Sequence, residues 1–217
     1  MSPPTRLIEA LIARAPAVVG LMEVGPARAQ ALAADPELAR RYPYRELRPF
    51  AAGGGLALLS SWPIAVEPEV PWVSVVEASV AVGGGELRVI VAHAPNPLTS
   101  RARGAALARL RSMLLGQVAA GRPAVLLADL NTSDLEPAFR GFMRGLVDVP
   151  GSIVRRPPRT WGPLPGGPVF LRIDHAIATP DITPLSFAVD GDASDSDHCL
   201  LEVQVALPEA PSPGLAA

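Results

Sequence analysis

Short apolar runs constrain the fold of this sequence more than any other feature. Each is long enough for a buried β-strand, and most are bounded by turn residues rather than continued at helical spacing. The runs lie at residues 17–22, 56–60, 72–82, 87–93, 123–128, 170–178 and 199–207. A stretch of three consecutive glycines separates 72–82 from 87–93, so these two runs are predicted to form a hairpin.

Helical patterns separate only some of these runs. Apolar residues recur at four-residue spacing within residues 5–12, which predicts a helix with one apolar stripe. We also expect a helix at 27–41 with a break at Asp35, and a long helix at 100–120 capped by Ser100. Strand-rich sequence with interspersed helices favours a layered α/β sandwich over a parallel repeat of strand, helix and strand.

The length and composition suit one domain with a substantial core. The chain has 217 residues, of which 49% are hydrophobic and 18% charged, which argues against a disordered protein. No repeat, linker or low-complexity segment divides residues 1–207, so we predict a single domain there. Residues 208–217 are rich in proline and alanine and are predicted to be a frayed tail.

Two absences narrow the chemistry. The single cysteine, Cys199, excludes an internal disulfide framework and a cysteine-rich zinc site. All basic residues are arginine, because the sequence contains no lysine. A lysine-containing phosphate loop and a Schiff-base lysine are therefore excluded. The net charge of −2 gives no basic signature of strong nucleic-acid binding, and no run is a convincing membrane helix.

Polar residues gather where the apolar runs end or begin, which is where a sandwich presents a site. These residues are Glu23, His93, Asp129, Asn131, Asp174, Asp197 and His198. Each has an ordinary alternative: a carboxylate at a strand end is more often a helix cap or a solvated turn residue. Asp129 or Asn131, for example, is a candidate cap for a helix near residue 135, and His93 is a candidate structural histidine.

Alternation along a strand strengthens the interpretation as a site. Asp129 and Asn131 are two residues apart and are predicted to face the same side. Arg172, Asp174 and Ala176 are likewise predicted to share one face of an apolar strand. A carboxylate there is costly unless it is paired or binds a ligand.

Several of these segments together resemble the endonuclease/exonuclease/phosphatase superfamily. The motifs are LMEV at 21–24, GGLALLSSWPI at 54–64, ADLN at 128–131, RIDH at 172–175 and SDH at 196–198. His93 occupies the place of the family's central histidine, and the resemblance extends over residues 7–205. It implies a four-layer α/β sandwich in which two mostly antiparallel mixed sheets pack face to face, with helices outside.

The resemblance also implies a chemistry, the Mg²⁺-dependent hydrolysis of a phosphate ester by in-line attack of water, with Mn²⁺ as a substitute metal. It makes Glu23 the principal metal ligand and places Asp197 close to the metal. Asp129 and Asn131 would orient the water and hold a phosphate oxygen. Asp174 would pair with His198, which stabilises charge at phosphorus, and His93 would contact the phosphate from the other side.

The sequence departs from the family pattern at its beginning. The family's first strand carries an asparagine that supports the metal site, and this sequence has no counterpart to it. Three interpretations are open: a working phosphodiesterase or phosphatase, a repurposed fold that acts as a binding module or without metal, and a chain completed by strand pairing with another chain. Residues 49–66 also offer no carboxylate to pair with His93.

Substrate and compartment are less constrained. The sequence has little room for DNA-gripping insertions, which favours a small or lipid-like phosphodiester over duplex DNA. The arginine cluster at 155–159 is either a second phosphate site or a solvated loop, and Trp62, Trp72 and Trp161 are candidates for an apolar entrance. One cysteine and no signal-peptide pattern favour the cytoplasm, with export left open by the missing first strand.

Overall fold

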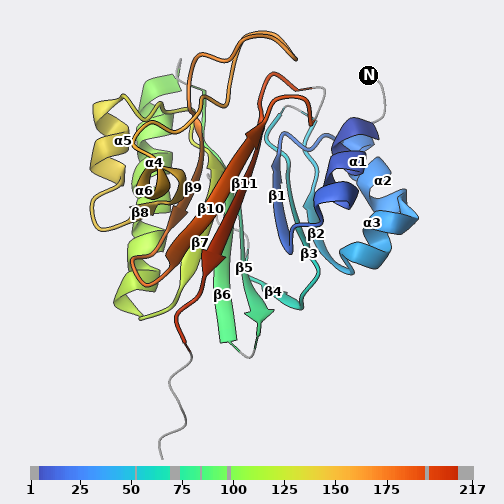
Figure 1. Cartoon of the computed structure of the whole chain (residues 1–217), viewed down its shortest axis with the longest axis horizontal. Helices are drawn as coiled ribbons and strands as arrows, with labels where there is room; N and C mark the ends of the chain where they lie inside the picture. Colours follow the sequence, from blue (N-terminus) through green and yellow to red (C-terminus); the bar gives the residue numbers. More distant parts are fainter. Residues whose placement is uncertain are drawn as a thin grey trace, which may run out of the picture.

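The computed structural model describes residues 5–51, 53–68, 74–83, 85–96, 99–193 and 196–209. Helices occupy the two outer sides of the molecule, and β-strands lie between them (Figure 1). This arrangement confirms the predicted four-layer α/β sandwich. None of the helices described is long and apolar enough to cross a bilayer.

A six-stranded sheet forms one inner layer. In spatial order its strands are β4 (Ile64–Val66), β5 (Ser74–Val82), β6 (Gly85–His93), β7 (Ala124–Asp129), β9 (Asp174–Ala178) and β8 (Val147–Asp148). The β6–β7 pair is parallel and the other pairs are antiparallel. The β5–β6 pair is the predicted hairpin, while β6 and β7 need the long helix α4 (Ser100–Ala119) as a crossover because they are parallel.

The second inner layer consists of two separate pieces. One is the three-stranded sheet β1–β3–β2, formed by Val18–Met22, Leu56–Ser60 and Tyr44–Arg48. The other is the two-stranded sheet of β10 (Thr183–Asp190) and β11 (Leu200–Ala206). Among the described residues, β1 pairs only with β3 and β11 pairs only with β10, so each piece has an open edge.

Helices cover the outer faces of the two inner layers. The three-stranded sheet carries α1 (Thr5–Arg14), α2 (Pro26–Ala34) and α3 (Pro36–Arg41). Asp35 ends α2 and caps α3 by accepting the Leu38 N–H, which explains the predicted break. Across the molecule, α4 and α5 (Pro137–Phe142) cover the six-stranded sheet, and the short α6 (Val149–Ile153) contacts β10.

Period-two alternation in the strands divides the buried side chains among three cores. In β3, Leu56 and Leu58 pack between the two inner layers, while Ala57 and Leu59 pack under α1–α3. The strands β6 and β7 divide in the same way: Val89 and Val125 point between the layers, and Ile90 and Leu126 point towards α4. Four layers need three such interfaces.

Two local expectations differ from the structure, and two strands were not expected. The strand predicted at 170–178 begins only at Asp174, because the segment before it pairs through Trp161 and Leu171 instead. The N-cap of α4 is Thr99 rather than Ser100, and it makes no side-chain cap. The strands β2 and β10 carry no long apolar run and were not predicted. Trp72 and residues 210–217 lie outside the described part of the chain, so the domain and tail boundaries stay predictions.

Candidate active site

Strand register places three of the predicted site residues in one row. His93 is directly opposite Asp129 across the β6–β7 pair, and Asp129 is directly opposite Asp174 across the β7–β9 pair. Residues paired across a sheet share a face. Asp129 alternates with Leu127, which packs between the layers, so the row lies at the end of the sandwich interior and faces the second layer.

The second layer supplies the residues opposite this row. Glu23 directly follows β1, and Asp197 and His198 precede β11. Together with the row they surround a pocket of about 670 Å³. All seven predicted site residues are therefore brought to one end of the sandwich, although Asp174 borders the neighbouring groove rather than this pocket.

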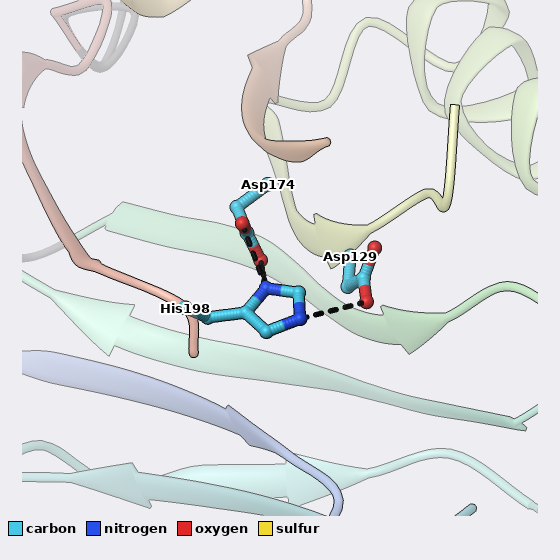
Figure 2. A group of neighbouring side chains, drawn as sticks. All are labelled: Asp129, Asp174 and His198. Atoms are coloured by element: carbon cyan, nitrogen blue, oxygen red, sulfur yellow. Dashed lines mark hydrogen bonds and ion pairs between the residues drawn. The ribbon is translucent and has the colours of Figure 1, made fainter. Parts of the chain in front are cut away.

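His198 is held between two carboxylates (Figure 2). Its Nδ1 lies 3.0 Å from both carboxylate oxygens of Asp174, and its Nε2 lies 4.0 Å from Oδ2 of Asp129. Burial alone lowers the pKa of His198, but the hydrogen bond and charge of Asp174, aided by Asp129 and Asp197, outweigh it and raise the pKa to about 9. His198 is therefore a cation at neutral pH, with Nδ1–H donated to Asp174.

Asp129 is buried, with 5% of its surface exposed. Burial and the nearby charge of Asp174 raise its pKa, and the backbone N–H of Asn131 and the charge of His198 oppose the rise. The net result is a pKa of about 7. A carboxyl group with this pKa can exchange a proton near neutral pH, which is a property expected of a general base or acid.

His93 is fixed by the glycine-rich segment and by Asn131. Its Nδ1 lies 3.2 Å from the Gly53 carbonyl oxygen, and its Nε2 lies 3.3 Å from Nδ2 of Asn131. The first contact fits a ring that donates Nδ1–H, because a carbonyl oxygen can only accept. The missing carboxylate in residues 49–66 is thus replaced by a backbone carbonyl, while Nε2 also lies 3.5 Å from Oδ2 of Asp129.

Glu23 and Asn131 both adopt left-handed backbone conformations, with φ of 55° and 46°. This conformation is unfavourable for a glutamate, so the surrounding structure must hold the turn in place. The side chain of Glu23 is 61% exposed, and its Oε1 lies 4.0 Å from Nε2 of His93. The turn therefore presents an open carboxylate at the mouth of the pocket.

The structure does not support the alternative interpretation of Asp129 or Asn131 as a helix cap. The following helix, α5, begins at Pro137, and its N-cap is Glu136. Asp129 instead accepts the backbone N–H of Asn131 at 2.7 Å, and Asn131 donates to the Ala94 carbonyl at 2.9 Å. Both contacts stay within the strand ends that form the pocket.

The tryptophans and the arginine cluster that the sequence suggested for the site lie partly at the pocket and partly away from it. Trp161 lines the pocket and donates its Nε1–H to Asp197 at 3.1 Å, whereas Trp62 packs between the layers. In the arginine cluster, Arg155 and Arg156 are exposed. Arg159 pairs with Asp134 at 3.1 Å.

The prediction that Arg172 shares a face with Asp174 is wrong. Arg172 lies before β9, is buried, and pairs with Asp148 at 2.5 Å while its guanidinium lies over the Phe139 ring. The Arg172 guanidinium therefore lies on the opposite side of the sheet from Asp174, where its charge is balanced by Asp148.

Sequence patterns missed two supporting groups. The Gly53 carbonyl is the partner of His93, and Arg103 on α4 donates to the Asn131 carbonyl and pairs with Glu136. The glycine-rich run at 53–55 was a signal for a close backbone approach. The sequence gives no signal that singles out Arg103 from the other arginines of its helix.

One set of donors is close enough to hold a metal ion among the residues described. Ligand atoms of Asp129, Asp174 and His198 all lie within 4.8 Å of one another. Glu23 is outside this set, although its Oε1 and the Oδ2 of Asp129 lie 4.0 Å and 3.5 Å from the same atom, Nε2 of His93. Asp197 accepts the indole N–H of Trp161. Four carboxylates against two histidines leave the site with an excess of negative charge, which suits a divalent cation with hard oxygen ligands.

The histidine of the RIDH motif, His175, lies behind the site. It is 1% exposed, stacks on Phe139 at 4.4 Å, and donates Nε2–H to the Thr132 carbonyl at 2.9 Å. Burial and the charge of Arg172 lower its pKa to about 4. His175 is therefore a neutral structural residue.

His175 is expected to destabilise the fold as the pH falls. Its folded pKa of about 4 is below the ordinary histidine pKa of 6.5, so the unfolded chain takes up the proton first. Stability is therefore lost between these two values as the pH drops. The loss relative to a His175→Phe variant is expected to be about 3 kcal/mol. Urea unfolding of both proteins at pH 7 and pH 4 measures it, and parallel losses in the two proteins would contradict the assignment.

Comparison with solved structures identifies the fold. A humanized D. rerio TDP2 matches with a TM-score of 0.72 and 18% identity, covering 93% of this chain and 91% of that one. An endonuclease/exonuclease/phosphatase from Beutenbergia cavernae matches at 0.68 and 22%, covering 95% and 67%. The mannosyl-6-phosphatase Bt3783 from Bacteroides thetaiotaomicron matches at 0.67 and 14%, covering 93% and 90%.

Sequence comparison gives the family directly. No curated protein matches the chain in sequence. The model of the endonuclease/exonuclease/phosphatase family, however, matches residues 1–198, a range that contains every candidate site residue described above. This chain therefore belongs to the endonuclease/exonuclease/phosphatase family.

Proposed function

We propose that this chain is a divalent-metal-dependent phosphodiesterase that uses Mg²⁺, with Mn²⁺ as a substitute. The observation that carries the proposal is the row of His93, Asp129 and Asp174 opposite Glu23 and a cationic His198. The row combines a proton acceptor, a positive charge and open oxygen ligands around one pocket. Hydrolysis of a phosphate ester needs these three elements.

The donor set fits a hard divalent cation. We assign Glu23 as the principal ligand because its carboxylate is 61% exposed at the pocket mouth, 4.0 Å from Nε2 of His93. We also assign Asp197 to the metal site, close to the metal or to its water. When bound, the metal supplies a Lewis acid that polarises a phosphoryl oxygen. Mg²⁺ keeps several waters, so one or two carboxylates suffice.

The remaining residues act on the water and the phosphate. Asp129, with a pKa of about 7, accepts the proton of the attacking water. His198 offers Nε2–H to the charge that develops at phosphorus, while Asp174 holds its ring. His93 contacts the phosphate from the opposite side. We assign the side-chain N–H of Asn131 as the donor to a non-bridging oxygen of the phosphate. This hydrogen bond would replace the contact that Nδ2 of Asn131 now makes with Nε2 of His93.

The charge of the pocket favours a diester. Its lining contains two histidines but no arginine among the described residues. A phosphodiester carries one negative charge and a monoester up to two, so the monoester would need more positive charge than this lining provides. Two exposed aromatic residues lie next to residues of the lining: Phe50 beside Gly54, and Phe170 before Leu171 in the sequence, exposed by 60% and 57%. They support a small or lipid-like ester over duplex DNA. Among the structural neighbours are both a complex of D. rerio TDP2 with single-strand DNA product and a phosphatase.

Hydrolysis assays test the proposed activity. Bis(p-nitrophenyl) phosphate is expected to be turned over with Mg²⁺ or Mn²⁺, faster than p-nitrophenyl phosphate, and not in EDTA. Asp181→Asn, which changes an exposed carboxylate away from the pocket, should behave as wild type. Equal turnover in EDTA would exclude the metal, and faster turnover of the monoester would exclude the diester preference.

Calorimetry tests the metal ligand separately from turnover. Glu23→Gln is expected to weaken Mg²⁺ binding at least about tenfold, because the neutral amide is a poorer ligand for a hard cation. Glu9→Gln, on the exposed side of α1, is the matched control and should bind Mg²⁺ normally. Unchanged affinity in the Glu23 variant would reassign the site to the Asp129, Asp174 and His198 donors.

A further inference from the structure

A short segment, residues 160–162, lies between the two stretches of chain that carry Asp174 and His198. On one side, Trp161 pairs through its backbone with Leu171, which lies shortly before β9. On the other side, the same residue pairs with His198. The segment therefore links the six-stranded sheet to the residues that precede β11, at the catalytic end of the sandwich.

Thr160 is the buried polar residue of this segment, with 1% of its surface exposed. Its Oγ1 accepts the backbone N–H groups of Ile173 and Asp174, each at 3.2 Å. Its backbone carbonyl accepts the N–H of Cys199 at 2.7 Å. One residue thus holds the chain next to Asp174 and the chain next to His198.

The Thr160 hydroxyl acts where the sheet offers no neighbouring strand. β8 pairs with β9 at Ile177 and Ala178 and, within the described residues, does not reach Asp174. The hydroxyl therefore serves the N–H groups at the start of β9 in place of a strand. A backbone N–H away from water is costly when it has no acceptor. Without the hydroxyl, the start of β9 must therefore move or take in a water.

The start of β9 sets the position of the Asp174 carboxylate. Asp174 is the first residue of the strand, and both of its carboxylate oxygens lie 3.0 Å from Nδ1 of His198 (Figure 2). A movement of this backbone therefore moves the carboxylate directly. The His198 ring depends on the same segment, because the next residue, Cys199, donates to Thr160. Thr160 thus acts on both ends of the Asp174–His198 hydrogen bond.

The other end of β9 provides a threonine of the same local chemistry without a catalytic neighbour. Thr179 directly follows β9 and is fully buried. Its Oγ1 accepts the backbone N–H of Ala124 at 2.9 Å. Thr179 therefore represents a buried threonine with a purely structural role, and it is the matched control for Thr160.

We propose that Thr160 is a positioning residue for phosphate-ester hydrolysis, whose hydroxyl holds the Asp174 carboxylate against the His198 ring. The kinetic part of this inference rests on the proposed function, whereas the geometry of the two side chains does not. Thr160 does not line the catalytic pocket, so it acts through Asp174 and His198 and not on substrate binding. Misplacing a catalytic group by about 1 Å can cost about 10²-fold in rate.

Steady-state kinetics with bis(p-nitrophenyl) phosphate and Mg²⁺ measure the kinetic part. Thr160→Val keeps the branched shape but removes the acceptor, and it is expected to lower kcat about 10–100-fold with KM changed less than about twofold. Thr160→Ser keeps the hydroxyl and should stay within about threefold of wild type, as should Thr179→Val. Wild-type kcat in Thr160→Val would overturn the proposal. An equal loss in Thr160→Ser or in Thr179→Val would also overturn it.

The ring nitrogen chemical shifts of His198 test the geometry without activity or metal. They are read at pH 7 in EDTA through the carbon-bound protons of the ring and are assigned by their absence in His198→Ala. Asp174→Asn gives the reference for a ring that has lost its carboxylate partner. Thr160→Val is expected to move the shifts towards this reference, while Thr160→Ser and Thr179→Val keep the wild-type shifts. Wild-type shifts in Thr160→Val would overturn the proposal. The expected shifts together with an inactive wild type would contradict the proposed function alone.

Urea unfolding separates positioning from loss of structure. Thr160→Val and Thr179→Val each leave a backbone N–H without its acceptor, so both are expected to unfold at lower urea concentration than wild type. If Thr160→Val does not fold, Thr160→Ala replaces it in both measurements, because its smaller side chain leaves room for a water at the two N–H groups. Wild-type kcat and wild-type ring shifts in Thr160→Ala would then overturn the proposal.

Discussion

Asp174→Asn is expected to lower kcat/KM for phosphodiester hydrolysis by about 10²–10⁴-fold without unfolding the protein. Asp174 accepts from Nδ1 of His198 and provides most of the charge that raises the His198 pKa to about 9. An amide at this position removes that charge, and burial then lowers the His198 pKa. The ring becomes neutral at pH 8 and loses the positive charge that faces the phosphate.

The pH profile distinguishes this effect from simple damage. In wild type, activity is expected to fall as the pH rises above about 9, where His198 loses its proton. In Asp174→Asn the residual activity should fall at a lower pH, and a His198→Ala, Asp174→Asn double variant should be no worse than His198→Ala alone. Asp181→Asn is the control. Residual activity with an unchanged alkaline limb would refute the role of Asp174.

The sequence predicted which polar residues gather at one end of the fold because strand ends and strand register are local properties. Each of β1, β6 and β7 is an apolar run that ends at its polar residue, so Glu23, His93 and Asp129 were predictable at one edge of the layers. Register then aligned His93, Asp129 and Asp174. What sequence could not provide was the strain at Glu23, since a positive φ leaves no pattern in a single sequence.

Other elements depend on tertiary contacts and escaped prediction for that reason. The strand β2 is the polar sequence Tyr44–Arg48, held in the layer by its pairing with β3. Arg172 looked like a charge beside Asp174, but its partner Asp148 is 24 residues away. The sequence showed no counterpart to the family motif that carries an asparagine. The open edges of β1 and β11 in the described part of the chain, across a groove, required the structure.

Asp129→Asn is expected to abolish measurable hydrolysis and to stabilise the metal-free fold. The wild-type carboxyl has a pKa of about 7 when folded, whereas the ordinary pKa of an aspartate is 3.8. The folded state therefore holds its proton while the unfolded state releases it, and stability is lost as the pH rises through this window. A neutral amide removes the loss, so the variant is expected to gain about 2–4 kcal/mol at pH 8 in EDTA.

Urea unfolding in EDTA at pH 4 and pH 8 measures this difference. The wild type and Asp129→Asn should be close in stability at pH 4 and separate at pH 8, with Asp181→Asn following the wild type at both. A variant less stable than wild type at pH 8 would show that the charge of Asp129 is favourable in the fold. The expected gain has a functional origin: a buried carboxyl poised to accept a proton near pH 7 is retained at a cost in stability because the reaction needs it.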